Sequence, residues 1–97
     1  MHLQGKVAIV TGAGGGFGSG ISRTFAREGA SLVLADIHYH AAEKVANELK
    51  AQDVKALALA VDVSNEKQVC NMVNQAMSEF GQIDILVNNA GASLSSF

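Results

Sequence analysis

The sequence is short of residues that several classes of protein need. Its 97 residues include no proline, no tryptophan and one cysteine, Cys70. A single cysteine excludes an intramolecular disulfide and a zinc site built from cysteines. Seven Lys and Arg stand against nine Asp and Glu, and the basic residues form no run. We therefore expect no nucleic-acid partner.

Long apolar runs are also missing. The longest wholly apolar run, residues 56–61, is far below the roughly 20 residues of a membrane helix, so we expect no membrane partner. The first six residues, MHLQGK, lead into a strand-like run and do not resemble a signal peptide. These features favour a cytoplasmic location. The length and a hydrophobic content of 48% predict a single domain with a globular core.

Short apolar runs alternate with stretches of helical spacing. Four runs resemble strands, at residues 7–10, 32–35, 56–61 and 85–87. None alternates between apolar and polar residues, as expected for parallel strands covered by helices on both faces. The order β-α-β-α-β-α-β follows. An α+β domain with mixed strands is the alternative, and the regular alternation argues against it.

Three helices are expected between these runs. The first has Ile21 and Phe25 four residues apart, with Gly29 placed to end it in the left-handed conformation. The apolar stripe of the second helix consists of Ala41, Ala42, Val45, Ala46 and Leu49. The stripe of the third consists of Val69, Val73, Ala76 and Phe80. Ser64 is the expected N-cap of the third helix and Gly81 its expected end.

A glycine-rich turn, TGAGGGFG at residues 11–18, joins the first strand to the first helix. Glycine lets a backbone pass close to a phosphate, and the N–H groups that begin a helix attract an anion. The spacing is G-x-x-x-G-x-G on Gly12, Gly16 and Gly18, and no placement of G-x-G-x-x-G fits. Ser19 stands where a P-loop needs lysine, which argues against an ATPase or GTPase. A flexible surface loop is the alternative, disfavoured by the strand before and the helix after.

The second strand ends at Asp36, 18 residues after Gly18. A carboxylate there can accept hydrogen bonds from the adenosine ribose hydroxyls, and it repels a 2′-phosphate. The turn and the carboxylate together favour NAD over NADP as the cofactor. The alternative is that Asp36 is an ordinary carboxylate at the end of a strand, and the glycine-rich turn argues against it.

These residues carry a family resemblance that spans essentially the whole chain. The segment from Thr11 to Gly18 resembles the T-G-x-x-x-G-x-G turn of the classical short-chain dehydrogenase/reductase family, with Phe17 where Ile or Leu is more usual. Asp62-Val63 resembles the family's adenine-contacting pair, and residues 88–91 resemble its N-N-A-G motif. The chain thus looks like the N-terminal, cofactor-binding half of such an enzyme.

The resemblance implies a set of cofactor contacts. Asp62 would bond the adenine amino group, Val63 a ring nitrogen through its backbone, and residues 88–91 would brace the sheet beside the nicotinamide ribose. The residues expected to bind the cofactor are Gly12, Gly14, Gly15, Gly16, Phe17, Gly18, Asp36, Ile37, Asp62, Val63, Asn89, Ala90 and Gly91.

No catalytic residue can be assigned. The family uses Ser, Tyr and Lys, the last two as Y-x-x-x-K, and the Tyr hydroxyl exchanges the proton. The one tyrosine, Tyr39, has Glu43 four positions later and follows Asp36, at the adenosine end. The serines at 93, 95 and 96 precede the strand at which the family's serine stands. The chain therefore reads as truncated after the fourth strand.

Two other features are weaker. His38 and His40 flank Tyr39, but alternate loop residues rarely converge on one ion, so we expect no metal. We expect Cys70 to be a half-buried structural cysteine rather than a reactive thiol.

The predicted architecture is an α/β, three-layer, doubly wound Rossmann-type fold over residues 1–97, with a four-stranded parallel sheet in the order 3-2-1-4. Right-handed crossovers place the first two helices on one face and the third on the other. One helix cannot cover a four-stranded face, so we expect bare side chains among residues 7–10 and 85–87. With the open edge of the fourth strand, these predict self-association.

Three functions remain open at this point. The chain can be part of an NAD-dependent enzyme that transfers hydride between an alcohol and a ketone. It can bind NAD or another adenine nucleotide without turnover. It can also be an inactive truncated product. The substrate cannot be predicted, because the resemblance places the substrate loop after these residues.

Overall fold

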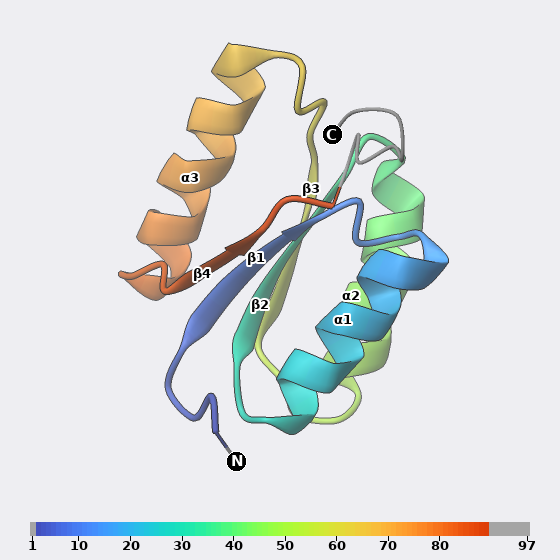
Figure 1. Cartoon of the computed structure of the whole chain (residues 1–97), viewed down its shortest axis with the longest axis vertical. Coiled ribbons are helices and arrows are strands. Elements are labelled where there is room, and N and C mark those ends of the chain that lie inside the picture. Colours follow the sequence, from blue (N-terminus) through green and yellow to red (C-terminus); the bar gives the residue numbers. More distant parts are fainter. Residues whose placement is uncertain (1, 90–97) are drawn as a thin grey trace.

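Four strands and three helices alternate along the chain in a computed structural model that describes residues 2–89. The elements are β1 (Val7–Thr11), α1 (Gly16–Arg27), β2 (Ser31–Asp36), α2 (Tyr39–Lys50), β3 (Ala56–Ala60), α3 (Glu66–Phe80) and β4 (Ile85–Val87). The strands are parallel and lie in the order β3-β2-β1-β4, as predicted (Figure 1).

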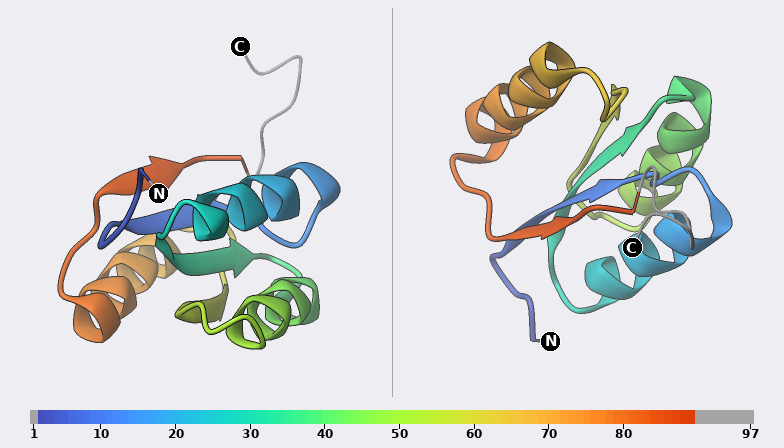
Figure 2. Two further views of the ribbon diagram at one scale, coloured as in Figure 1. Left: turned by 90° about the horizontal axis from the view of Figure 1, so that it is seen from below. Right: turned by 45° about the horizontal axis from the view of Figure 1, so that its top comes forward.

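The sheet lies between two helical layers, with α1 and α2 on one side and α3 on the other (Figures 1 and 2). On β1, Ala8 and Val10 face the core formed with α1 and α2, whereas Ile9 faces α3. This alternation explains why the strand is apolar at every position, since both of its faces are covered. The layers confirm the doubly wound arrangement expected from right-handed crossovers.

Of the two strand segments expected to have bare side chains, only β4 has exposed or half-buried residues. Residues 7–10 are all buried, so the expectation that they would be bare is wrong. β1 is an inner strand, α1 packs on one face of it, and Met72 and Ala76 of α3 share the second core with Ile9 on the other. Leu86 pairs with Ile9 in register and so points to the α3 face, but its side chain is 60% exposed.

The inward faces of the helices follow the predicted stripes only in part. The α2 residues Ala42, Val45, Ala46 and Leu49 are buried, as predicted, whereas Ala41 of the predicted stripe is only half-buried. In α3, the buried residues are Met72 and Ala76, and Val73 is 39% exposed. Successive helical residues are rotated by about 100°, so Met72 and Val73 cannot both face the sheet. In α1 the buried side is lined by small residues, and Ile21 and Phe25 are only partly buried.

The helix ends confirm the glycine predictions and correct one cap. Gly29 and Gly81 both have positive φ, of 99° and 77°; Gly81 directly follows α3, and Gly29 follows Glu28, the C-cap of α1. The N-cap of α3 is Asn65, whose side chain accepts the Gln68 N–H, so Ser64 is not the cap. Cys70 is exposed, which contradicts the half-buried prediction. Within residues 2–89, none of the helices is both long and apolar enough to cross a membrane.

The amino ends of β1 and β4 are fastened by Asp84. Its Oδ2 accepts the Val7 N–H at 2.8 Å, and its own N–H donates to the Val7 carbonyl at 2.9 Å. The Gln82 side-chain amide donates to the same carboxylate at 2.7 Å and to the Gly5 carbonyl at 2.9 Å. These bonds, led by the Val7 N–H, hold the pKa of Asp84 below its ordinary value. The carboxylate therefore stays charged and keeps the short β4 in register with β1.

Candidate functional site

The carboxyl ends of the parallel strands meet at one edge of the sheet, and the connections that leave them enclose a cleft. Its volume is about 450 Å³. The cleft is lined by Gly12, Gly15, Asp36, Ile37, Val61, Asp62, Val63 and Ser64. Most of these residues are among those predicted to bind a cofactor, and they come from three different connections. Val61 and Ser64 were not predicted, although they flank the predicted Asp62-Val63 pair.

The glycines of the β1–α1 turn divide into two groups. Gly12 has a φ of 65°, which favours glycine, and a Cβ on Gly14 or Gly18 would overlap a neighbour, Ala41 for Gly14 and the Gly12 backbone for Gly18. These three glycines are required by the fold. Gly15 and Gly16 are exposed, and a Cβ on Gly16 would meet open space. Gly16 is therefore where a ligand can approach the backbone.

The first turn of α1 presents free backbone donors. Gly15 is the N-cap and has no side chain to cap the helix, and the first turn has no acidic residue. Among the hydrogen bonds of residues 2–89, none is donated by the N–H of Gly16, Phe17 or Gly18. Together with the positive end of the helix dipole, these groups favour an anion such as a phosphate. The Phe17 side chain, 79% exposed, stands beside them.

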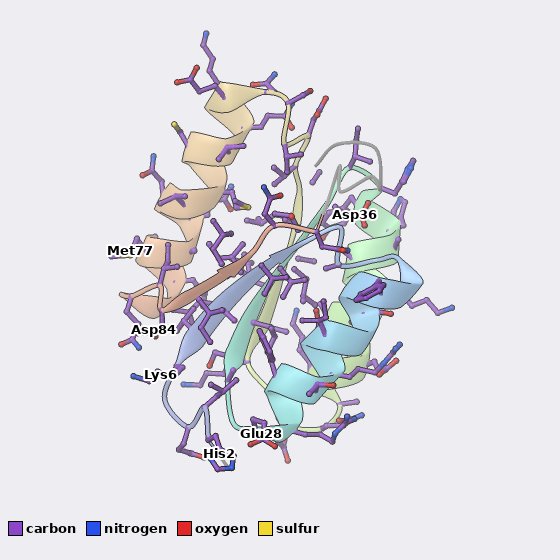
Figure 3. All side chains as sticks on the ribbon, viewed as in Figure 1. His2, Lys6, Glu28, Asp36, Met77 and Asp84 are labelled. Atoms are coloured by element: carbon purple, nitrogen blue, oxygen red, sulfur yellow. The ribbon has the colours of Figure 1, made fainter. Side chains whose placement is uncertain are left out.

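Asp36 connects this turn to the end of β2 (Figure 3). Its side chain is buried, with 7% of the residue exposed. Oδ2 accepts the N–H of Gly14 at 2.9 Å, and Oδ1 accepts the N–H of His38 at 2.9 Å. A carboxylate has room for about four hydrogen bonds, so both oxygens can still accept a further donor. Asp36 thus places negative charge in the cleft beside the glycine-rich turn.

Asp62 is held in the cleft by its own turn. Its Oδ1 accepts the hydroxyl of Ser64 at 2.6 Å and the Ser64 N–H at 2.9 Å. These two bonds, the hydroxyl first, lower the pKa of Asp62, so the group is ionised at neutral pH. The Asp62 N–H donates to the Gln68 side chain at 2.8 Å, while Val63 packs against the α3 core. The carboxylate is an acceptor for a donor entering the cleft.

Thr11 and Asn89 join the carboxyl ends of β1 and β4. The Thr11 hydroxyl accepts the Asn89 N–H at 2.9 Å and lies 3.2 Å from Asn88 Oδ1. The Asn89 side-chain amide donates to the Gly12 carbonyl at 3.4 Å. Asn89 therefore contacts the glycine-rich turn directly. Sequence reasoning did not select Thr11 as a site residue, although a hydroxyl at the end of an apolar strand is a usable signal. Ala90 and Gly91 lie outside the described residues.

Tyr39 and its neighbouring histidines lie at the start of α2. The Tyr39 hydroxyl donates to Glu43 Oε2 at 3.3 Å, and the Glu43 charge raises the pKa of the phenol. His40 Nδ1 lies 3.5 Å from Glu43 Oε1. A raised pKa opposes proton release, so this tyrosine is poorly suited to act as a base. No group of three or more metal-binding side chains occurs among residues 2–89.

Known proteins are similar to this chain in both sequence and fold. The family model for short chain dehydrogenases matches residues 6–97. The chain is 47% identical to the uncharacterized oxidoreductase YxjF of Bacillus subtilis (strain 168), covering 92% of this chain and 35% of that protein. A hydroxysteroid dehydrogenase crystal structure from Escherichia coli superposes with a TM-score of 0.90 at 44% identity, over 94% of this chain and 39% of that one.

A second structure carries a cofactor. The 3-ketoacyl-(acyl-carrier-protein) reductase from Brucella melitensis, complexed with NADH, superposes with a TM-score of 0.80 at 48% identity, over 87% of this chain and 34% of that one. The fold is therefore of the Rossmann type. The chain belongs to the short-chain dehydrogenase family. It spans about a third of the length of the relatives that it matches.

Proposed function

We propose that residues 1–97 form a single dinucleotide-binding domain and are the cofactor-binding part of an NAD-dependent oxidoreductase. The whole enzyme would oxidise an alcohol or reduce a ketone by hydride transfer. One observation carries the proposal: the buried Asp36 carboxylate stands beside a glycine-rich turn whose helix presents unfilled N–H groups. A dinucleotide is a ligand that needs both, since it has a pyrophosphate and an adenosine ribose.

The cleft suggests how the cofactor would lie. The pyrophosphate would accept the N–H groups of Gly16, Phe17 and Gly18. The adenosine would extend towards Asp36 and the Ile37, Asp62 and Val63 side of the cleft. The nicotinamide ribose would lie on the side of Asn89, Ala90 and Gly91. When bound, the nicotinamide supplies the hydride chemistry, and these residues hold and orient it.

Asp36 favours NAD over NADP. Its two hydrogen bonds come from backbone N–H groups of Gly14 and His38, and within residues 2–89 no basic side chain donates to it. The carboxylate can accept ribose hydroxyls, whereas a 2′-phosphate would meet the negative charge of this carboxylate. NAD is therefore the proposed cofactor.

The proton transfer of the reaction would come from residues beyond these 97. Tyr39 lies at the adenosine side, and its hydroxyl donates to Glu43. A general acid or base must lie within hydrogen-bond reach of the reacting oxygen, which would be at the opposite side of the cleft. We expect the purified chain to give no turnover with a panel of alcohols and NAD. Steady production of NADH would contradict this expectation.

Calorimetric titration with NADH, NADPH and ADP tests the binding proposal. We expect NADH to bind at least about tenfold more tightly than NADPH, because an unpaired like charge costs more than about 1.4 kcal/mol. Asp36→Asn removes the charge and should narrow the difference in affinity between NADH and NADPH. Tighter binding of NADPH by the unmutated chain would overturn the NAD preference. Equal affinities for ADP and NADH would instead favour an adenine-nucleotide module without catalysis.

A further inference from the structure

We propose that Asp36 is also a positioning residue for the phosphate-binding turn, so that it supports the pyrophosphate half of the site as well as the ribose. This inference rests on the proposed function. Its basis is the bond from the Gly14 N–H to Asp36 Oδ2, at 2.9 Å, together with the bond from the His38 N–H to Oδ1. One side chain thereby joins the β1–α1 turn to the β2–α2 connection.

The turn needs such a support. Residues 12–16 include four glycines, and glycine loses more conformational freedom on ordering than any other residue. Within residues 2–89, Asp36 is the one side chain that accepts a hydrogen bond from the backbone of residues 12–15. The amide of Asn89 donates to this segment, at a longer 3.4 Å. The N–H of Gly14 therefore depends on Asp36 for its partner.

The second bond extends the effect to α2. The His38 N–H that Asp36 accepts belongs to the N-cap residue of α2. Gly14 also packs directly against Ala41 in the first turn of the same helix. The contact is so close that a Cβ on Gly14 would overlap Ala41. Asp36 thus sets the turn against a rigid helix rather than against a loop. The spacing between Gly14 and α2 fixes where the following N–H groups of Gly16 and Phe17 point.

The inference predicts an effect opposite in sign to simple electrostatics. Asp36 is an anion near the phosphate site, so electrostatics alone predicts that removing its charge relieves a Coulomb repulsion and strengthens the binding of a phosphate. If Asp36 positions the turn, its removal should weaken that binding instead. A ligand without a ribose separates the two cases, since ribose recognition cannot contribute. Inorganic pyrophosphate is such a probe.

The experiment compares the full chain with Asp36→Ala, Asp36→Asn and the control Glu43→Gln, which removes an equal charge from the outer surface of α2. Amide exchange by NMR reports on Gly14, normalised to the amides of β2, and the normalisation separates local opening from global unfolding. We expect Gly14 to exchange about tenfold faster in Asp36→Ala, as for the loss of one hydrogen bond to a charged group. Asp36→Asn keeps one acceptor oxygen, so its Gly14 exchange rate should be intermediate. The rate in Glu43→Gln should equal that of the wild type.

Pyrophosphate titration of the same proteins completes the test. We expect its dissociation constant to rise about three- to tenfold in Asp36→Ala, less in Asp36→Asn and not in the control. Unchanged exchange at Gly14, or equal or tighter pyrophosphate binding by Asp36→Ala, would overturn the positioning role while leaving NADH binding intact. A wild-type chain that binds neither pyrophosphate nor NADH would overturn the proposed function, and this inference with it.

Discussion

Asp36 and Asp84 lie at opposite ends of the sheet, and each accepts backbone N–H groups (Figure 3). The hydrogen-bond partners of Asp84 are Val7 and Gln82, and these bonds hold β1 and β4 in register. Around Asp36, the partners are Gly14 and His38, next to exposed glycines and unfilled N–H groups of α1. The same chemical group thus fastens strands at one end and shapes a cleft at the other. We infer that the amino end serves stability and the carboxyl end serves binding.

The largest effect expected at the carboxyl end is structural. Gly18→Val places a branched side chain against the Gly12 backbone, which cannot move aside without opening the turn. We expect it to destabilise the chain by about 2–3 kcal/mol or to prevent folding. Gly20→Val is the matched control, because a Cβ at Gly20 meets open space in the same helix. Equal midpoints of urea unfolding for the two variants would show that Gly18 is not constrained.

Gly16→Val should separate binding from folding. The position is exposed and has room for a side chain, and its φ is not left-handed, so we expect a stability change below about 1 kcal/mol. The valine would occupy the space that the pyrophosphate needs, and NADH affinity should fall at least about tenfold. Calorimetric titration and urea unfolding measure the two quantities. Losses of similar size in both would assign Gly16 to the fold.

Asp84→Asn tests the amino end by its pH dependence. The folded-state pKa of Asp84 is depressed, so its stabilisation is present above the unfolded pKa of about 3.9 and is lost as the pH falls through the lower folded value. The wild type should therefore exceed the variant in stability at pH 7, and the difference should shrink between about pH 5 and pH 2. Urea unfolding at several pH values measures this.

A second carboxylate contributes to the same acid sensitivity. The His2 N–H holds the pKa of Glu28 below its ordinary value, so Glu28 also loses its stabilisation on acidification. The variant Asp84→Asn should thus retain part of the pH dependence. A stability difference between wild type and Asp84→Asn that is independent of pH would refute the role of the charged carboxylate. NADH affinity at pH 7 should be equal in the two proteins.

Leu86→Lys should change association more than stability. Leu86 is 60% exposed on β4, which is an edge strand of the sheet formed by residues 2–89. Edge strands with exposed apolar residues pair with other chains, and lysine at an edge prevents this. We expect the wild type to self-associate at micromolar concentration and the variant to shift towards monomer. Light scattering after size exclusion measures the mass, with Phe17→Lys as a control on α1. A monomeric wild type would contradict the prediction.

The sequence predicted the strand order and most of the residues that line the cleft, because parallel strands and a glycine-rich turn leave strong local signals, but it missed Val61 and Ser64. In α3 it correctly selected Val69, Ala76 and Phe80 as core-facing residues, but it could not determine whether Met72 or Val73 faces inwards. Met72 and Val73 are both apolar neighbours, and only the packing against Ile9 selects Met72. The burial of Ile9 depended on where α3 crosses the sheet, which no local pattern encodes, whereas Ala8 and Val10 lie in the core formed with α1 and α2.

The N-cap of α3 and the partners of Asp36 also could not be predicted from local sequence. Ser64 and Asn65 are adjacent residues of equal capping tendency, and the Ser64 hydroxyl is used by Asp62. Asp36 could be placed at the end of a strand from the sequence, but its bond to Gly14, 22 residues away, is set by the tertiary structure. Its predicted role in ribose binding remains a prediction.

Mapping NADH onto the backbone amides by NMR tests the contrast between the two ends most directly. We predict that the amide signals of residues 12–18 and of Asp36, Asp62 and Val63 shift on addition of NADH. Those of Val7, Gln82 and Asp84 should remain unchanged. Shifts centred on the amino end of the sheet, or no shift at saturating NADH, would contradict the account.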